Sequence, residues 1–137
     1  MTKKEKAALL HAKGYNCAQS VACAFCEDLG LDEELIFKLN EGFGAGFGGG
    51  KSACGALSGA IMLAGLKTSS GNLFAPDSKK ATYKVAAQFT EDFKQKAGSI
   101  ICEEIKGINN GTPLISCAQC ISIGVELFEE YLNTLKK

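Results

Sequence analysis

Apolar residues recur at three- and four-residue spacing along most of the chain, which is the pattern of helices that bury one face. In the range 77–97, for example, Ala86, Phe89 and Phe93 fall on one apolar stripe. No segment alternates apolar and polar residues with the β-branched side chains that are typical of a strand. The pattern therefore predicts an all-α fold.

Capping residues and glycines indicate where these helices begin and end. Asn16 precedes one expected helix and Gly30 follows it. A loop over 42–50 contains six glycines, and the segment 107–113 is expected to break the chain before the last helix. The expected helices cover 3–12, 17–29, 32–41, 52–66, 77–97 and 117–135, with a short helical turn over 99–106.

The length of 137 residues suits one buried core, because a chain of this size buries about two thirds of its unfolded surface. No linker separates two domains. We expect residues 1–137 to form a single-domain helical bundle of five to six helices, with the Gly-rich loop before the central helix. Gly55 and Gly59 lie on a small-residue face of that helix that permits close helix packing, which alone could explain them. They are also candidate cofactor-binding positions.

Charge and hydropathy exclude several classes of partner. The chain has 15 basic and 15 acidic residues, and every basic residue is lysine, so nothing indicates bulk phosphate neutralisation. We therefore expect no nucleic-acid and no membrane partner. The longest apolar run, 53–66, suits a buried helix better than a bilayer span, and the amino end lacks the apolar region of a signal peptide. These features predict a cytoplasmic protein.

Cysteine content points to the chemistry. Seven cysteines are many for this length, and in a reducing cytosol such a pattern indicates metal binding or catalysis before structural disulfides. The cysteines are Cys17, Cys23, Cys26, Cys54, Cys102, Cys117 and Cys120.

Four of these cysteines are expected in the first turns of four helices. The segments 16–19 and 116–119 each combine a polar cap residue with a glutamine three positions later, which predicts capping boxes before Cys17 and Cys117. Cys54 follows the expected cap Ser52 by two residues, and Cys102 follows the expected cap Ser99 by three. Helix amino ends favour negative charge, so thiolates are favoured there.

If these helix starts converge, Cys17, Cys54, Cys102 and Cys117 form one site that is catalytic, metal-binding or both. Free cysteine is also a common buried apolar residue, and that interpretation is preferred for Cys23 and Cys26, which are expected in mid-helix. Cys120 completes a CxxC with Cys117 at a helix start, and its role stays open.

The residues also carry a family resemblance. Cys17 in Asn-Cys-Ala-Gln, the Gly-rich loop leading into Cys54-Gly-Ala-Leu-Ser-Gly, and the single cysteines Cys102 and Cys117 resemble the C_GCAxxG_C_C family of redox-active proteins. The likeness spans about residues 6–135. The family label would read Gly-Cys-Ala, whereas this chain reads Cys-Gly-Ala at 54–56, so the match is to the spaced pattern.

The resemblance implies four family cysteines at Cys17, Cys54, Cys102 and Cys117. It also implies a redox partner protein, an oxidoreductase or transporter component, and it favours an iron-sulfur cluster as the cofactor. The oligomeric state stays open, with a homodimer as one option.

Three functions are therefore expected, in this order. The first is a redox or electron-transfer accessory protein whose four cysteines exchange disulfides or bind an iron-sulfur cluster. The second is an interaction module with structural zinc on the same four thiolates. The third is a nucleotide-binding enzyme, because the segment 45–52 satisfies a relaxed P-loop pattern ending in Lys51 and Ser52; it lacks the preceding strand that a P-loop needs.

Overall fold

The computed structural model describes residues 1–108 and 111–136. Within these residues the structure is helical, with one isolated antiparallel bridge between Ala53 and Ile101 and no strand. The predicted all-α fold class is confirmed. The α-helices are α1 (Lys3–Ala12), α2 (Cys17–Cys23), α3 (Cys26–Leu29), α4 (Glu33–Asn40), α5 (Gly55–Thr68), α6 (Lys79–Ala97), α7 (Cys102–Lys106) and α8 (Cys117–Leu135).

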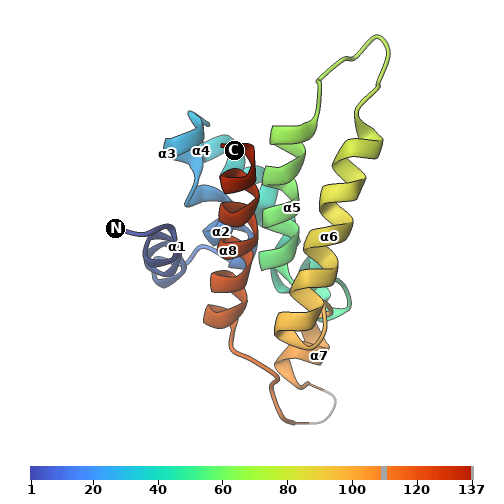
Figure 1. Cartoon of the computed structure of the whole chain (residues 1–137). Coiled ribbons are helices and arrows are strands. Elements are labelled where there is room, and N and C mark those ends of the chain that lie inside the picture. Colours follow the sequence, from blue (N-terminus) through green and yellow to red (C-terminus); the bar gives the residue numbers. More distant parts are fainter. Residues whose placement is uncertain (109–110, 137) are drawn as a thin grey trace.

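Helix α5 is the centre of the bundle, as expected. It packs against α2, α6 and α8, and the three long helices α5, α6 and α8 run side by side (Figure 1). Helix α1 packs on α8 and α2, while α4 packs on α2. The largest fully buried side chains are those of Phe25, Phe93, Phe128, Leu57 and Leu63, and they belong to one apolar core.

The helix count differs from the prediction of five to six. The described residues form eight α-helices, of which six have seven residues or more, and the surplus consists of the short helices α3 and α7. The expected helix over 17–29 is divided because the chain turns at Ala24 and Phe25. This turn places the Phe25 ring edge-on against Phe128, with the ring centroids 4.8 Å apart, so core packing outweighs helix continuity.

Two predicted helix starts were wrong. Helix α5 begins at Gly55, with Cys54 as its N-cap, and α7 begins at Cys102 with Ile101 as its N-cap. Neither Ser52 nor Ser99 caps a helix. Instead, the backbone of Ser52 accepts a hydrogen bond from the Cys102 amide at 2.9 Å.

The Gly-rich loop is folded tightly rather than open. A 3₁₀ turn over Glu41–Phe43 leads into a π-helical turn over Gly46–Gly50. Gly46 has a φ of 60°, and a Cβ atom at this position would lie 2.6 Å from the Cβ atom of Cys102. The glycine therefore allows the loop backbone to press against the start of α7.

Two other predictions concern the cytoplasmic location and the chain break before α8. In the part of the chain that the structure describes, no helix has the length and apolar character needed to cross a membrane. The cytoplasmic location stays a prediction. The predicted chain break over 107–113 includes Asn109 and Asn110, which lie outside the described residues.

Candidate functional site

Five cysteines line one small cavity of about 30 Å³. Four of them are the candidates predicted from the sequence, which the structure brings together from four helix starts. The fifth is Cys120, which the sequence left open. The cysteines of this cavity, called the cysteine cluster below, are Cys17, Cys54, Cys102, Cys117 and Cys120.

The amino ends of α2, α5, α7 and α8 supply the cluster. Cys17, Cys102 and Cys117 are the first residues of α2, α7 and α8, and Cys54 is the N-cap of α5. In Figure 1 the amino ends of α5 and α8 lie at the lower end of the bundle, on the side of α7. Cys120 lies one turn after Cys117 in α8, on the same face of the helix, so its side chain also lines the cavity.

The capping boxes position two of the cysteines as predicted. The Asn16 side chain accepts from the Gln19 amide at 2.8 Å, and the Gln19 side chain accepts from the Asn16 amide at 2.9 Å. Ser116 and Gln119 make the same reciprocal pair before α8. These local bonds define where each helix begins, and therefore where its first cysteine lies.

A backbone bridge positions the other two cysteines. The Cys54 amide donates to the Ile100 carbonyl at 2.7 Å, and the Cys102 amide donates to the Ser52 carbonyl at 2.9 Å. These two bonds flank the pairing of Ala53 with Ile101. The start of α5 is thereby held against the start of α7, although almost fifty residues separate them in the sequence.

Cys54 has a more acidic thiol than an ordinary cysteine. A side-chain hydrogen bond from Cys120 lowers the pKa of Cys54 to about 7. The backbone amides of Ala56 and Leu57 and the nearby Lys106 ammonium act in the same direction, against the opposing effect of burial. About half of Cys54 is therefore thiolate at pH 7, the form that attacks disulfides and binds metals.

Cys17, Cys102 and Cys120 stay protonated at pH 7. Burial, followed by the charges of Cys117 and Cys54, raises the pKa of Cys17 to about 12. Burial raises the pKa of Cys102, and the hydrogen bond to Cys54 raises the pKa of Cys120. The cluster therefore combines the ionised sulfur of Cys54 with the protonated thiols of Cys17, Cys102 and Cys120, which is the arrangement of a nucleophile beside thiols that can resolve its adducts.

The pKa shifts divide four of the cluster cysteines into two pairs. Cys120 has the largest influence on the pKa of Cys54, and, after burial, Cys117 is the neighbour that most raises the pKa of Cys17. Cys54 and Cys120 are buried, whereas Cys17 and Cys117 are partly exposed. Cys102 is buried, and burial is the main cause of its raised pKa. The cluster thus has a buried pair, an accessible pair and one additional thiol.

Two residues that line the cysteine cavity were not identified from the sequence. Cys120 follows Cys117 by three positions, and this helical spacing was the available signal that both could face one cavity. Lys106 lines the cavity from the last residue of α7. No sequence signal distinguishes Lys106 from the other lysines, because its proximity to the thiols depends on how α7 packs.

The glycines of α5 lie where helix packing is closest. A Cβ atom on Gly59 would lie 2.7 Å from the Ala18 carbonyl oxygen in α2, and one on Gly55 would lie 3.1 Å from the Ala18 amide nitrogen. Gly55 also lines the cysteine cavity. These contacts account for both glycines by packing, and their cofactor-binding role stays a prediction. The Gly-rich loop lies against Cys102 at Gly46.

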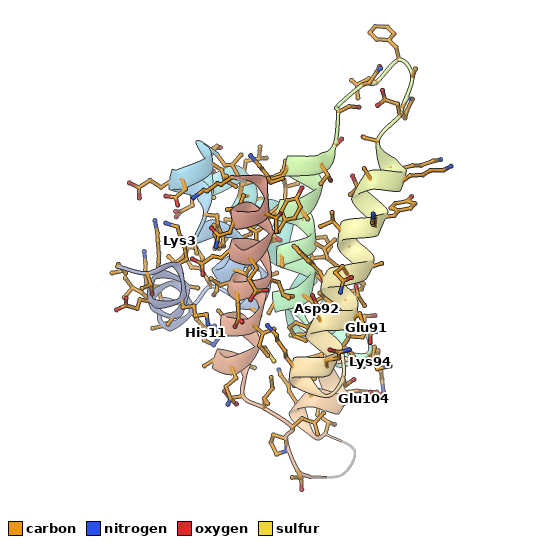
Figure 2. All side chains as sticks on the ribbon, in the orientation of Figure 1. Lys3, His11, Glu91, Asp92, Lys94 and Glu104 are labelled. Carbon is orange, nitrogen blue, oxygen red and sulfur yellow. The ribbon has the colours of Figure 1, made fainter. Side chains whose placement is uncertain are left out.

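The residues behind the nucleotide hypothesis lie outside the cluster. Lys51 is 78% exposed and forms an ion pair with Glu103 at 3.0 Å. Helix α4 and a 3₁₀ turn precede the Gly-rich segment, in the place where a P-loop requires a strand. The single histidine of the chain, His11, also lies away from the cluster, on α1 (Figure 2). Its Nδ1 atom is 3.1 Å from the Tyr15 carbonyl oxygen. None of these residues lines the cysteine cavity.

The donor geometry of the cysteine cluster determines whether it could hold a metal. Among the described residues, no group of three or more His, Cys, Asp and Glu side chains is arranged so that it could hold a metal ion. The five thiols have the right chemistry for zinc or an iron-sulfur cluster. Their arrangement, with contacts in pairs around about 30 Å³, does not form a metal site, and both cofactors stay predictions.

Comparison with known proteins agrees with the cysteine pattern. The family model described as "Putative redox-active protein (C_GCAxxG_C_C)" matches residues 15–131, which include the whole cysteine cluster. The chain belongs to this family. No curated protein and no solved structure matches the chain. Membership establishes the redox-active family and leaves the cofactor and the partner undefined.

The raised thiol pKa values predict that the protein loses stability in alkaline solution. Above about pH 8.5 the cysteines of the unfolded chain ionise, whereas burial raises the pKa of Cys17 and of Cys23 to about 12, so the folded protein retains these protons. The unfolding free energy should therefore fall between about pH 8.5 and 12, by about 1.4 kcal/mol per group and pH unit.

Urea unfolding at a series of pH values measures this slope. Cys23→Ala should reduce this slope of unfolding free energy against pH by about 1.4 kcal/mol per pH unit, because alanine removes one retained proton. Equal slopes for the variant and the unmodified protein would contradict the prediction.

Proposed function

We propose that the protein is a thiol-disulfide redox protein in which Cys54 is the attacking thiolate and Cys120 is the resolving thiol. The observation that carries the proposal is the proximity of these two buried side chains, which line the same cavity and are each the largest influence on the pKa of the other. The helix amides of Ala56 and Leu57 stabilise the same thiolate. Membership in a redox-active family supports this assignment.

The exchange proceeds in two balanced steps. The Cys54 thiolate attacks one sulfur of a partner's disulfide, so a mixed disulfide forms and one partner thiolate leaves. The Cys120 thiol loses its proton to that thiolate and attacks the Cys54 sulfur. The Cys54–Cys120 bond forms, the mixed disulfide breaks, and the second partner thiolate takes a proton from solvent. The partner is reduced by two electrons and the protein is oxidised by two.

The partly exposed pair indicates the route to the cluster. Cys17 and Cys117 are partly exposed to solvent, whereas Cys54 and Cys120 are buried, and all four residues line the same cavity. We infer that a partner's disulfide approaches on the side of these two residues. That the partner is an oxidoreductase or a transporter component follows from the family resemblance alone.

Trapping of the mixed disulfide tests the proposal. The reduced protein should react with an aromatic disulfide at pH 7 and release two equivalents of aromatic thiolate from the Cys54–Cys120 pair. Cys120→Ser should release one equivalent rapidly and retain an aromatic adduct on Cys54, which mass spectrometry of the digested protein locates. Because serine cannot resolve the adduct, its lifetime should increase at least tenfold.

Cys102→Ser is the matched control, since Cys102 lines the same cavity and is not one of the proposed pair. This variant should resolve its adduct as the unmodified protein does. The proposal is wrong if the adduct forms on another cysteine first, or if Cys120→Ser resolves it at the normal rate.

The metal alternatives have a separate test. Protein purified without oxygen is analysed for iron, labile sulfide and zinc. One equivalent of zinc or a stoichiometric cluster, retained by the unmodified protein and lost in Cys54→Ser, would replace the disulfide mechanism with a metal site on the predicted cysteines.

A further inference from the structure

Two cysteines outside the cluster form a separate pair at the junction of α2 and α3. Cys23 is the last residue of α2 and Cys26 is the first residue of α3, so they have CxxC spacing. They are 0% and 3% exposed, and each thiol is among the groups that shift the pKa of the other, so the two side chains lie near each other. The Cys26 thiol also donates to the Ala22 carbonyl, with the two atoms 3.9 Å apart. We propose that Cys23 and Cys26 are a second dithiol site, which closes into an intramolecular disulfide independently of the cysteine cluster.

The helix break creates this pair. The sequence predicted one helix over 17–29, with both cysteines as mid-helix core residues. The chain instead turns at Ala24 and Phe25, and α3 begins without a side-chain cap. The two cysteines flank this turn, so bond formation requires side-chain rotation and local adjustment of a short turn rather than movement of two long helices.

The surroundings separate this pair from the cluster. Neither residue lines the cysteine cavity. The charged groups near the pair are Glu33, Asp32 and Lys6, and Glu33 accepts a hydrogen bond from the Tyr15 hydroxyl at 2.7 Å. These residues come from α1, the α1–α2 loop and the start of α4. The pair is therefore oxidised and reduced in an environment of its own.

The two sites should differ in rate and in redox potential. Burial raises the pKa of Cys23 to about 12 and also raises the pKa of Cys26, so both thiols are protonated at pH 7 and react slowly. The reduced form of this pair lacks the thiolate stabilisation that Cys54 has. Since stabilising a thiolate makes a couple more oxidising, the Cys23–Cys26 disulfide should form last and be the harder one to reduce.

Hydrogen peroxide is a suitable oxidant, because it is small enough to reach a buried turn when the turn opens. Two thiols and one peroxide molecule give one disulfide and two water molecules. The sulfurs lose two electrons, the peroxide O–O bond breaks, and both thiol protons leave in water.

The experiment uses the full-length protein with Cys17→Ser. Trypsin cleavage after Lys13 and Lys38 then gives a peptide, 14–38, whose only cysteines are Cys23 and Cys26. The protein is treated with hydrogen peroxide, remaining thiols are alkylated, and the peptide is weighed. We expect the loss of two hydrogens and no alkylation, at a slower rate than oxidation of the peptides that carry Cys54 and Cys120.

Cys26→Ala in the same background is the matched control, because it keeps Cys23 and cannot close the disulfide. On reduction with dithiothreitol, peptide 14–38 of the Cys17→Ser protein should be the last to regain its thiols. If Cys17→Ser does not fold, peptide fragmentation of the unmodified protein locates the same bond. Full alkylation of Cys23 and Cys26 after the cluster has oxidised, or oxygen addition in place of hydrogen loss, would overturn the proposal.

Discussion

Replacing Cys54 by serine is expected to lower the rate of thiol alkylation at pH 7 by at least about tenfold. The reason is the fraction of thiolate: the pKa of Cys54 is lowered to about 7, so about half is ionised, whereas an ordinary thiol with a pKa of about 8.5 is ionised to roughly 3%. The other cluster thiols with shifted pKa values are less acidic still. Cys54 should therefore account for the fast phase of the reaction.

The measurement is the rate of iodoacetamide alkylation between pH 5 and 9, with the modified site located by mass spectrometry. The fast phase should titrate with a midpoint near pH 7. Cys120→Ser should move this midpoint, because the thiol hydrogen bond is the largest cause of the lowered pKa. Serine retains a hydroxyl donor, so Cys120→Ala should give the larger shift, toward higher pH. A fast phase that survives Cys54→Ser would assign the reactive thiol to another residue.

Replacing Gly59 by alanine is expected to destabilise the protein by about 1–3 kcal/mol, the usual cost of an extra methyl group in a well-packed core. The added Cβ atom would lie 2.7 Å from the Ala18 carbonyl oxygen and 3.1 Å from the Ala18 Cα atom. Both are backbone atoms of α2, so relief requires separation of α2 from α5. That separation would also move Cys17 away from the cluster.

Gly65→Ala is the matched control. Gly65 is in the same helix, and no heavy atom lies within 4 Å of the position its Cβ would take. Alanine should therefore stabilise α5 there by up to about 1 kcal/mol. Thermal or urea unfolding of both variants measures the difference. Similar stabilities would remove the packing explanation for Gly59 and would favour the predicted cofactor contact.

Local sequence signals predicted the starts of α2 and α8 correctly. Asn16 with Gln19 and Ser116 with Gln119 make reciprocal bonds over three residues, so the helix starts could be recognised without knowledge of the fold. The corresponding interpretation of Ser52 and Ser99 failed. The starts of α5 and α7 are instead set by the backbone bridge between Ala53 and Ile101, which pairs two segments that are distant in the sequence.

The sequence alone determined the all-α class, the amino ends of α2 and α8, and the cysteines of the redox-active family, because helix periodicity and capping act within a few residues. Only the tertiary structure decided that Cys120 contacts Cys54, that Lys106 lies beside the thiols, and that the chain turns between Cys23 and Cys26. These features depend on how α5, α7 and α8 meet and on the burial of Phe25. Thiol acidity depends on these same long-range contacts, since burial and neighbouring donors set each pKa.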